Sequence, residues 1–379
     1  MENKVLNKVI VYGGGVIGNL TSLCLKRNGL DVYQIQSNTN NNIDRTYALS
    51  PGSVDWMKSI GLSKVFFKSL YPIENIQIVR HGSKASFSAN SVFQPALAYM
   101  VSEKKLMKEI QVKLKSLNIK TFSEPKKIIL DNSPDQVRID LGKESLTASL
   151  LLACDGANSK IKDHLDIRKK IKNFNQKAIV FNFETSIDIE KNAKQYFLED
   201  SVLALLPIAP RTISVVWSCN HDFFETLNDK SESKFTIKLK SIIGNEFAEI
   251  SNISNKNNFP LTMVLNDKFF DKRVVLMGNA AHSIHPLAGQ GLNLGIRDII
   301  DFEKCLKSNY YKDIGLPGFL RRFERSRRLD TFEFSTLTSG LQWLFSRKSK
   351  LINQALIKGI KLLETKDNIK NYLIKKAIS

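Results

Sequence analysis

The stretch VIVYGGGVIGNL, residues 9–20, decides the fold expected for this chain. Lys8–Tyr12 is a short apolar, β-prone run, and three glycines in G-x-G-x-x-G spacing follow it: Gly13, Gly15 and Gly18. The first glycine permits a tight turn, the second lets a pyrophosphate approach the backbone, and the third lets the next helix pack closely on the sheet. That helix then presents free N–H groups and a positive dipole end to the anion. The stretch therefore predicts a dinucleotide-binding turn.

The residues after the turn complete the opening unit of a doubly wound α/β fold. Residues 19–28 carry helical spacing, and residues 31–35 form a second β-prone run. Together with the first strand they predict a βαβ unit. An acidic residue that binds the ribose is expected about 20 residues beyond the turn, but Gln36 stands there. Its amide oxygen can accept from a ribose hydroxyl without bringing a negative charge.

A second motif, LLACDGANSKIK at residues 151–162, ends an apolar strand abruptly at Asp155 and Gly156. Small residues and a basic stretch follow, which suits a turn at the edge of a cofactor. Without that context an Asp-Gly pair is simply a turn. Both interpretations stay open from the residues alone.

The third motif, VVLMGNAAHSIHPLAGQGLNLGIRD, covers residues 274–298. A strand runs into Gly278, small side chains leave room for a close ligand, and a glycine-rich loop opens a helix at residues 291–293. This second helix start can bind an anion or a dipole. His282 and His285 suggest a metal ligand or a base, but no acidic or cysteine partner stands at ligand spacing. A packing or hydrogen-bonding histidine is therefore favoured, and no metal is expected.

The composition is that of a globular enzyme. The 379 residues are 42% apolar and 25% charged, which is ordinary for such a protein. Four cysteines are scattered with no CxxC pair, which argues against a disulfide framework or zinc site and favours a reducing cytoplasm. The first strand begins too early to leave room for a signal peptide, and no apolar run approaches the roughly 18 residues of a spanning helix. A cytoplasmic protein is expected.

The middle of the chain changes character between about residues 170 and 270. Residues 178–183 and 212–217 alternate in polarity, which predicts an antiparallel sheet with one face able to line a cavity. An amphipathic helix is predicted over residues 100–117, and the chain after residue 320 has helical spacing almost throughout. The dinucleotide unit is therefore expected to be interrupted by a second, sheet-based unit.

These segments together resemble the class A flavoprotein monooxygenases, specifically the ubiquinone-biosynthesis hydroxylases. The most specific part of the resemblance is HPLAGQGLNLG, residues 285–295. The other matching segments are IDRTYALSPGSVDWMKSIGL (43–62), VSEKKL (101–106), LALLPIAP (203–210), VVWS (215–218) and FPL (259–261). The resemblance implies an α/β fold like that of para-hydroxybenzoate hydroxylase: a Rossmann-like FAD-binding domain, an inserted, mostly antiparallel β-sheet substrate domain, and C-terminal helices. The implied limits are 1–70, 98–168 and 269–318 for the FAD-binding domain, 71–97 and 169–268 for the substrate domain, and 319–379 for a basic helical region.

The resemblance also implies the chemistry. FAD, reduced by NAD(P)H or another donor, reacts with O2 to give a flavin C(4a)-hydroperoxide, which hydroxylates the ring of a polyprenylated phenol. A loop is expected to cradle the flavin ring and to stabilise developing negative charge; its catalytic residues are Pro286, Gly289, Gln290 and Gly291. The residues expected to bind FAD are Gly13, Gly15, Gly18, Gln36, Arg45, Asp155, Gly156, Gly278, Asn279, Pro286, Gly291, Leu292 and Asn293. The wall facing the substrate ring is expected to carry Ala204, Leu206, Pro207 and Trp217.

Three positions depart from the family pattern. Gln36 stands where Glu is common, Lys162 where Arg is common, and Asn279 where Asp usually meets the ribityl chain. Two alternatives therefore stay open beside the hydroxylase. One is a related flavoenzyme, such as a reductase or a halogenase. The other is a non-catalytic, FAD-poor member that serves as a structural subunit among other ubiquinone-biosynthesis proteins.

The net charge of +19 admits an anionic membrane or nucleic acid as a partner, and a drift in composition toward Lys, Asn and Ile explains it equally well. Residues 319–379 hold 14 basic and 5 acidic residues, an excess of nine. Apolar clusters alternate with basic residues over residues 341–378, as in a helix that lies on an anionic membrane. A helix packed on the enzyme body with a solvated basic face fits equally. No nucleic-acid partner is expected, and the membrane interpretation places the enzyme peripherally on a bacterial inner membrane.

Overall fold

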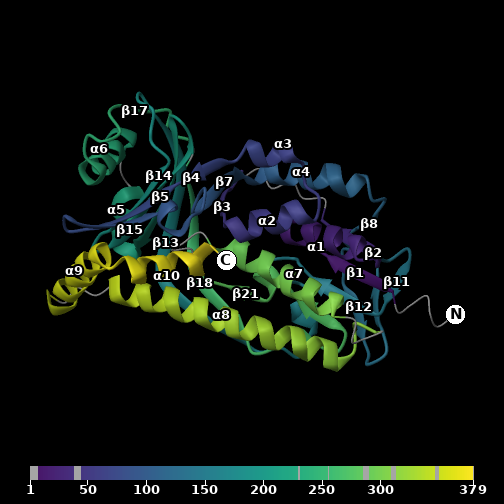
Figure 1. Ribbon diagram of the computed structural model, residues 1–379. Helices are drawn as coiled ribbons and strands as arrows, with labels where there is room; N and C mark the ends of the chain where they lie inside the picture. The colour runs from purple at the N-terminus through teal and green to yellow at the C-terminus, as the bar shows by residue number, and fades with distance from the viewer. Residues whose placement is uncertain are drawn as a thin grey trace.

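The computed structural model describes residues 7–37, 44–228, 231–254, 256–284, 290–308, 313–345 and 350–378. Two sheet-based units lie side by side, and the long helix α8 (Pro317–Phe345) runs along the lower edge of both (Figure 1). The α/β architecture expected from the sequence is confirmed.

The first unit is built on a six-stranded sheet of order β19-β20-β12-β1-β2-β8. The strands are β1 (Lys8–Tyr12), β2 (Asp31–Gln36), β8 (Lys120–Ser123), β12 (Leu150–Ala153), β19 (Phe270–Asp271) and β20 (Val274–Leu276). β1 pairs in parallel with both β2 and β12, and α1 (Val16–Arg27) connects β1 to β2. The predicted βαβ unit is confirmed.

Both faces of this sheet are covered, which explains why its strands read as apolar runs. Val9 and Val11 of β1 pack in a core with α1, α2 (Pro51–Ser59) and α7 (Gly291–Lys307). Ile10 and Tyr12 pack on the other face, in a core shared with a small antiparallel sheet. That sheet consists of β9 (Ile129–Asn132), β10 (Val137–Asp140) and β11 (Ser145–Ala148).

The helix predicted over residues 100–117 is shorter than expected. The structure places α4 at Glu103–Lys115, because Met100 belongs to β7 (Ala98–Ser102). β7 lies between β3 (Thr46–Leu49) and β4 (Tyr71–Ile73) in a three-stranded sheet. Ser102, the last residue of β7, is also the N-cap of α4: its hydroxyl accepts the Lys105 N–H, so the helix begins directly after the strand.

The second unit is built on a nine-stranded sheet whose main path is β21-β18-β13-β16-β15-β14-β5-β6, with β17 paired to β13. Its strands are β5 (Asn75–Arg80), β6 (Ser83–Ser88), β13 (Lys169–Thr185), β14 (Asn192–Phe197), β15 (Ser201–Ala209), β16 (Thr212–Asn220), β17 (Ile250–Ser251), β18 (Asn257–Asn266) and β21 (His282–Ser283). The antiparallel sheet expected over residues 178–183 and 212–217 is confirmed, and the two runs pair with each other in the β13–β16 register. β5 and β6 join this sheet from a separate part of the chain, with β5 parallel to β14.

The expected substrate-facing wall is wrong in part, because its four residues lie on opposite faces of the second sheet. Trp217 pairs with Leu203, whereas Ala204 and Leu206 alternate with Leu203 along β15. Trp217 is fully buried in a core with α5 (His221–Asn228) and α6 (Glu232–Ile243). Pro207 has the same parity as Leu203 and shares that face. Of the four, Ala204 and Leu206 remain on the opposite face, where Leu206 packs toward β4 and β7.

The C-terminal helices predicted after residue 320 are confirmed as α8, α9 (Lys350–Thr365) and α10 (Asp367–Ile378). Ile360 of α9 and Ile374 of α10 are buried, and Ile374 packs against Val92 and Leu97 of the second unit. α9 and α10 therefore pack on the enzyme body in part, while Leu362, Ile369 and Tyr372 stay exposed, and the side chains of residues 341–352 lie outside the described part of the chain. Within the described ranges, no helix combines the length and apolarity needed to cross a bilayer.

Candidate functional site

Three sequence motifs meet at one edge of the parallel sheet. β1, β12 and β20 are neighbouring strands, and the turns at Gly13, Asp155 and Gly278 follow their carboxyl ends. Gly13 approaches the second motif so closely that a Cβ there would lie 2.4 Å from the Cys154 carbonyl oxygen. Gly295 of α7 lies against Ile17 of α1, with only 2.7 Å available between a Cβ and the Ile17 Cδ1. Ligands of open α/β sheets bind at this edge.

The three glycines of the first motif have different roles. Gly13 has a φ of +130°, which other residues rarely adopt, and a Cβ on Gly18 would lie 2.1 Å from the Gly13 carbonyl oxygen. These two glycines are therefore required by the turn itself. Gly15 is different, because a Cβ there meets no described atom within 4 Å. The backbone at Gly15 thus faces open space at the start of α1, where a pyrophosphate fits.

Two buried amides, which none of the sequence motifs indicates, hold this turn. The Asn19 Nδ2 donates to the Gly14 carbonyl oxygen at 3.0 Å, and the Gln34 Nε2 donates to the Asn19 Oδ1 at 2.5 Å. Asn19 and Gln34 are 2% and 3% exposed, so these hydrogen bonds are shielded from water. In the sequence, each could have been noticed as a polar residue at a position that faces the core: Asn19 in the helix and Gln34 in the strand.

Gln36 lies directly against the glycine turn, since a Cβ on Gly14 would be 2.6 Å from the Gln36 Cβ. It also borders a cavity of about 450 Å³ between β2, β8 and α4. Polar side chains dominate the lining, among them Gln34, Gln111 and Lys115. The structure therefore keeps Gln36 beside the turn, as expected of the residue at the ribose position.

Asp155 carries a buried oxygen with no hydrogen-bond partner among the described residues. Its Oδ2 accepts the backbone N–H groups of Lys160 at 2.8 Å and Ile161 at 3.2 Å, whereas Oδ1 has no partner there. Burial raises the pKa of the Asp155 carboxyl, against the opposing hydrogen bond from Ser159. An unsatisfied buried acceptor costs free energy. This oxygen fits a hydroxyl donor from a polyol chain such as the one in FAD, and Gly156, at φ +87°, turns the chain away beside it.

The third motif is fixed by hydrogen bonds to its backbone. The Gly278 N–H donates to the Asp298 Oδ2 at 2.7 Å, and Asn266 Nδ2 donates to the Ala280 carbonyl oxygen at 2.9 Å. The buried Lys162 ammonium reaches the same carbonyl at 3.5 Å, and burial lowers the pKa of Lys162. Asn279 itself is exposed. Its side chain is therefore accessible to a ligand, while its neighbours are held in place.

Helix α7 begins at Gly291 as predicted, and its N-cap residue Gln290 makes no side-chain capping bond. The first N–H groups of a helix have no intrahelical partner, so this end can receive a negative charge. Leu292 packs its side chain against the core of the first unit. Pro286, Gly289 and His285 lie outside the described residues.

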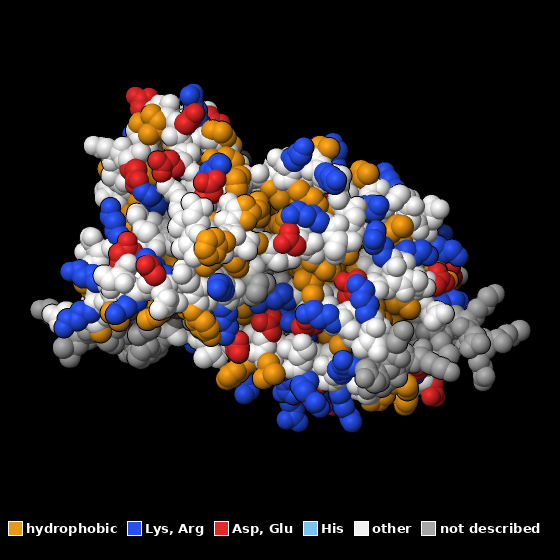
Figure 2. Space-filling view, in the orientation of Figure 1, with side chains coloured by type: hydrophobic (Ala, Val, Ile, Leu, Met, Phe, Trp, Pro, Cys, Tyr) orange, Lys and Arg blue, Asp and Glu red, His pale blue; other side chains and the backbone are white. Residues whose placement is uncertain are grey.

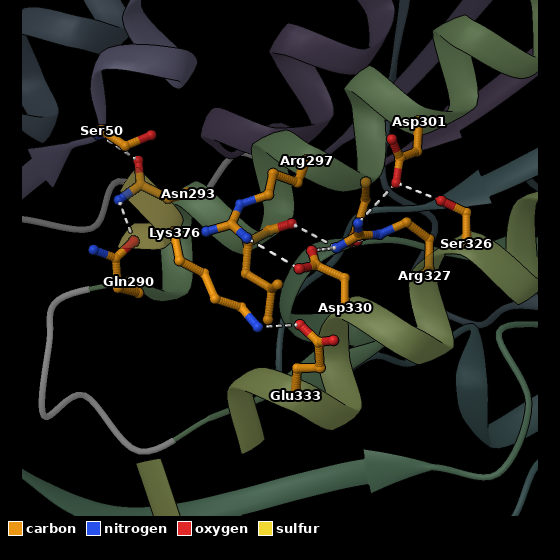
Figure 3. Close-up of polar contacts among 12 residues, drawn as sticks. Ser50, Gln290, Asn293, Arg297, Asp301, Ser326, Arg327, Asp330, Glu333 and Lys376 are labelled. Carbon is orange, nitrogen blue, oxygen red and sulfur yellow. Dashed lines mark hydrogen bonds and ion pairs between the residues drawn. The ribbon is translucent and has the colours of Figure 1, made fainter. Parts of the chain in front are cut away.

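The Asn293 side chain does not match the expected role as a cofactor contact. It is fully buried, and its Nδ2 donates to Ala48 O at 2.8 Å and to Gln290 Oε1 at 3.0 Å. Its Oδ1 accepts from the Ser50 N–H, which Figure 3 shows, and also from the Ser53 hydroxyl. Asn293 therefore ties the start of α7 to α2, and only its backbone is left to meet a ligand.

A buried charge network joins α7 to α8 beneath the third motif (Figure 3). Arg327 contacts Asp298 at 2.7 Å, Asp301 at 2.9 Å and Asp330 at 2.8 Å. His282 contacts the Asp298 Oδ2 at 2.9 Å, which confirms the hydrogen-bonding interpretation of this histidine. Burial alone would raise the pKa of the Asp298 carboxyl, but His282 and Arg327 hold it below its usual range.

Arg45 stands at the start of β3 and is exposed. Its carbonyl oxygen accepts the Glu103 N–H at 2.6 Å, which ties it to the beginning of α4. Burial raises the pKa of the neighbouring Tyr47 hydroxyl, and Glu103 raises it further, whereas Arg45 acts in the opposite direction. The guanidinium therefore lies at the surface, beside the Tyr47 hydroxyl.

We predict that Arg45→Ala lowers flavin affinity roughly 10- to 100-fold, because an arginine paired with a phosphate or the flavin edge contributes roughly 1.5–3 kcal/mol. The melting temperature of the apoprotein should change little, because the removed side chain is exposed. Flavin titration by fluorescence and thermal unfolding of the apoprotein measure the two effects. An apoprotein destabilised as strongly as by a core mutation would instead mark Arg45 as structural.

The chain matches a family model described as an FAD binding domain over residues 7–329. Ubiquinone hydroxylase UbiL of Rhodospirillum rubrum is 26% identical over 381 residues, which cover 98% of this chain and 89% of that protein. The 3-demethoxyubiquinol 3-hydroxylase of Escherichia coli is 25% identical over 339 residues, or 86% of each chain. The structure of p-nitrophenol 4-monooxygenase PnpA from Pseudomonas putida is similar, with a TM-score of 0.79 and 19% identity over 98% of both chains. The chain therefore belongs to the FAD-binding-domain family, and its fold is that of the flavin-dependent monooxygenases.

Proposed function

We propose that this protein is an FAD-dependent monooxygenase that hydroxylates the aromatic ring of a polyprenylated phenol in ubiquinone biosynthesis. The observation that supports this most directly is the meeting of three turns, at Gly13, Asp155 and Gly278, on one edge of the sheet. Two relatives that align over most of the chain are hydroxylases of ubiquinone or demethoxyubiquinol by name. The resemblance of the motifs to ubiquinone-biosynthesis hydroxylases is confirmed by these comparisons.

The residues present fit FAD. We assign the pyrophosphate to the open backbone around Gly15, the ribose to Gln36, and the ribityl chain to Asp155 and Asn279. The open space at Gly15 and the unsatisfied Asp155 Oδ1 support these assignments. When bound, FAD supplies the activation of O2, because no protein side chain carries out that chemistry.

The protein would contribute orientation and exclusion of water. In this assignment the loop through Pro286, Gly289, Gln290 and Gly291 covers the flavin ring, and the N–H groups at the start of α7 stabilise negative charge there. Leu292 and Asn293 contribute through their backbones. Ala204 and Leu206 are the members of the expected wall that we retain as substrate-facing.

The same assignment divides the chain into an FAD-binding domain (1–70, 98–168 and 269–318) and a substrate domain (71–97 and 169–268), with residues 319–379 as a helical region. The reductant would be NAD(P)H. A polyprenylated substrate resides in the bilayer, so we also propose that the enzyme works at an anionic membrane surface, beside other ubiquinone-biosynthesis proteins.

Purified protein should be yellow and should incorporate one atom of oxygen from ¹⁸O2 into a phenolic ubiquinone precursor with a short prenyl tail. Mass spectrometry of the product and NAD(P)H consumption measure the reaction. Consumption of NAD(P)H with peroxide release and no ring product would contradict the hydroxylase assignment.

A second candidate function is a flavin-poor structural subunit of a quinone-biosynthesis assembly. The exchange of two expected carboxylates for Gln36 and Asn279 favours it. Purified protein that contains no flavin, and that gains none after incubation with FAD, would support this candidate over the hydroxylase.

A further inference from the structure

The solvent face of α8 has an unusual composition. Six of its exposed residues recur with helical spacing and form one stripe: Arg321, Arg325, Arg328, Leu329, Phe332 and Thr336. Leu329 is 66% exposed and Phe332 is 68% exposed, although both are large apolar side chains. We call these six residues the α8 stripe.

The acidic residues of α8 are directed away from the stripe or neutralised. Glu324 accepts the Phe269 N–H at 2.8 Å, and Asp330 pairs with Arg327 and Arg297. Glu333, the exposed one, pairs with Lys376 of α10 at 2.8 Å. The stripe therefore presents positive charge without compensating carboxylates of the same helix.

Figure 2 shows the consequence at the lower edge of the molecule. A group of Lys and Arg side chains projects below the α8 region, with apolar side chains beside it along the same edge. A row of arginines next to an aromatic and an aliphatic side chain is the composition of helices that lie in a membrane interface, with the apolar residues among the headgroups.

We infer that the α8 stripe is the surface by which this enzyme binds an anionic phospholipid membrane. The charge is complementary to such a surface, and the α8 stripe, from Arg321 to Thr336, extends over about 23 Å of the helix. A second copy of the chain is a poor occupant, because a two-fold contact would place the same arginines against one another. The inference rests on the proposed membrane-resident substrate and names the surface involved.

This surface differs from the tail clusters considered from the sequence. In α9 and α10, Ile360 and Ile374 are buried, whereas Leu362, Ile369 and Tyr372 are exposed. The α8 stripe keeps its apolar residues exposed while the inner side of the same helix is anchored by buried residues such as Phe319, Phe323 and Arg327. Contact with lipid therefore requires no rearrangement of the fold.

The test compares two variants that lose the same charge on different sides of the molecule. One carries Arg321→Gln, Arg325→Gln and Arg328→Gln. The control carries Lys64→Gln, Lys104→Gln and Lys108→Gln, whose exposed lysines lie on α3 (Lys64–Lys68) and α4 at the opposite edge (Figure 1). Flavin content and melting temperature establish that both are folded.

Wild type should sediment with phosphatidylglycerol vesicles at low salt, and weakly with phosphatidylcholine vesicles or at 1 M salt, where the Debye length falls to about 3 Å. The α8 variant should bind the anionic vesicles roughly 100-fold more weakly, because the loss of every one to two basic residues lowers the affinity about tenfold. The control should lose less than about threefold. If both variants lose vesicle binding equally, the α8 stripe is not the membrane-binding surface, and the net charge of the protein accounts for the binding.

A separate pair of variants tests the apolar part of the stripe. Phe332→Ser should weaken vesicle binding about tenfold, because a phenyl ring is withdrawn from the interface. Val112→Ser on α4 is the control, since Val112 is 63% exposed on the opposite edge. Unchanged binding by Phe332→Ser would contradict lipid insertion by the stripe. If the wild-type protein does not bind anionic vesicles, the inference is wrong, and an acidic protein becomes the expected partner of the arginines. The hydroxylase assignment would still be tested separately by ¹⁸O incorporation.

Discussion

Gly15→Val is expected to yield folded apoprotein that has lost most of its affinity for FAD. The new side chain projects into the open space at the start of α1, where no described atom lies within 4 Å of a Cβ. The backbone at this position, with φ −76° and ψ −177°, suits any residue, so the substitution adds no strain. Blocking the pyrophosphate removes about two charge-assisted hydrogen bonds, so affinity should fall roughly 10²- to 10⁴-fold.

Gly18→Ala is the matched comparison within the same motif. A Cβ on Gly18 would lie 2.1 Å from the Gly13 carbonyl oxygen, so this smaller substitution must push the turn and α1 apart. It should lower the melting temperature of the apoprotein, whereas Gly15→Val should not. Absorbance at 450 nm and thermal unfolding separate the two. Flavin retained by Gly15→Val at the wild-type ratio would show that the pyrophosphate does not lie over this turn.

Local patterns predicted the parts of the fold that depend on neighbours in sequence. The strand, glycine turn and helix of residues 8–27 were predicted because each residue acts through its own backbone or the next turn. The start of α7 at Gly291 was predicted for the same reason. The helical spacing around Met100 predicts a helix there, but Met100 belongs to β7. In that strand it pairs with Ala48 and Tyr71, which lie far away in sequence, so no local pattern indicates the strand.

The site beneath the motifs depends on contacts that no local pattern contains. Asn19 and Gln34 meet only after α1 has folded onto β2, and Trp217 could be assigned to a face only from its register with Leu203. Alternate residues of a strand face opposite sides of the sheet, so Pro207 cannot share a face with Ala204 and Leu206. Its place in the expected wall was therefore wrong on the sequence alone. From its position in the motif, Asn293 is expected to contact the cofactor. In the structure its side chain instead hydrogen-bonds to Ser50 and Ser53 at the start of α2, to Gln290 and to Ala48.

Arg327 illustrates how such contacts support the site without touching it. Its three carboxylate partners come from α7 and α8, and one of them, Asp298, also accepts the Gly278 N–H of the third motif. The guanidinium therefore sets the position of a turn on another element. Because Asp298 is fully buried, its charge depends on Arg327 and His282 for compensation.

Arg327→Met is expected to destabilise the protein by about 3–5 kcal/mol, the usual cost of leaving a buried charge without its partner. Arg325→Met, two residues earlier on the exposed side of α8, should change stability by less than about 0.5 kcal/mol. Flavin affinity should fall in the Arg327 variant only, because Gly278 loses its fixed acceptor. Urea unfolding at neutral pH and flavin titration are the measurements, and equal stability losses in the two variants would refute the special role of the buried arginine.

The pH dependence gives this prediction a second readout. In wild type the pKa of Asp298 is lowered by folding, so its stabilising contribution is complete above the unfolded value of about 3.9 and is lost as pH falls through the folded pKa. Without Arg327, burial should raise that pKa, so acid protonates the carboxyl and relieves the variant. The stability difference between wild type and Arg327→Met should therefore shrink as pH falls toward 4. A difference that stays constant over that range would mean that lost packing, rather than an uncompensated Asp298 charge, destabilises the variant.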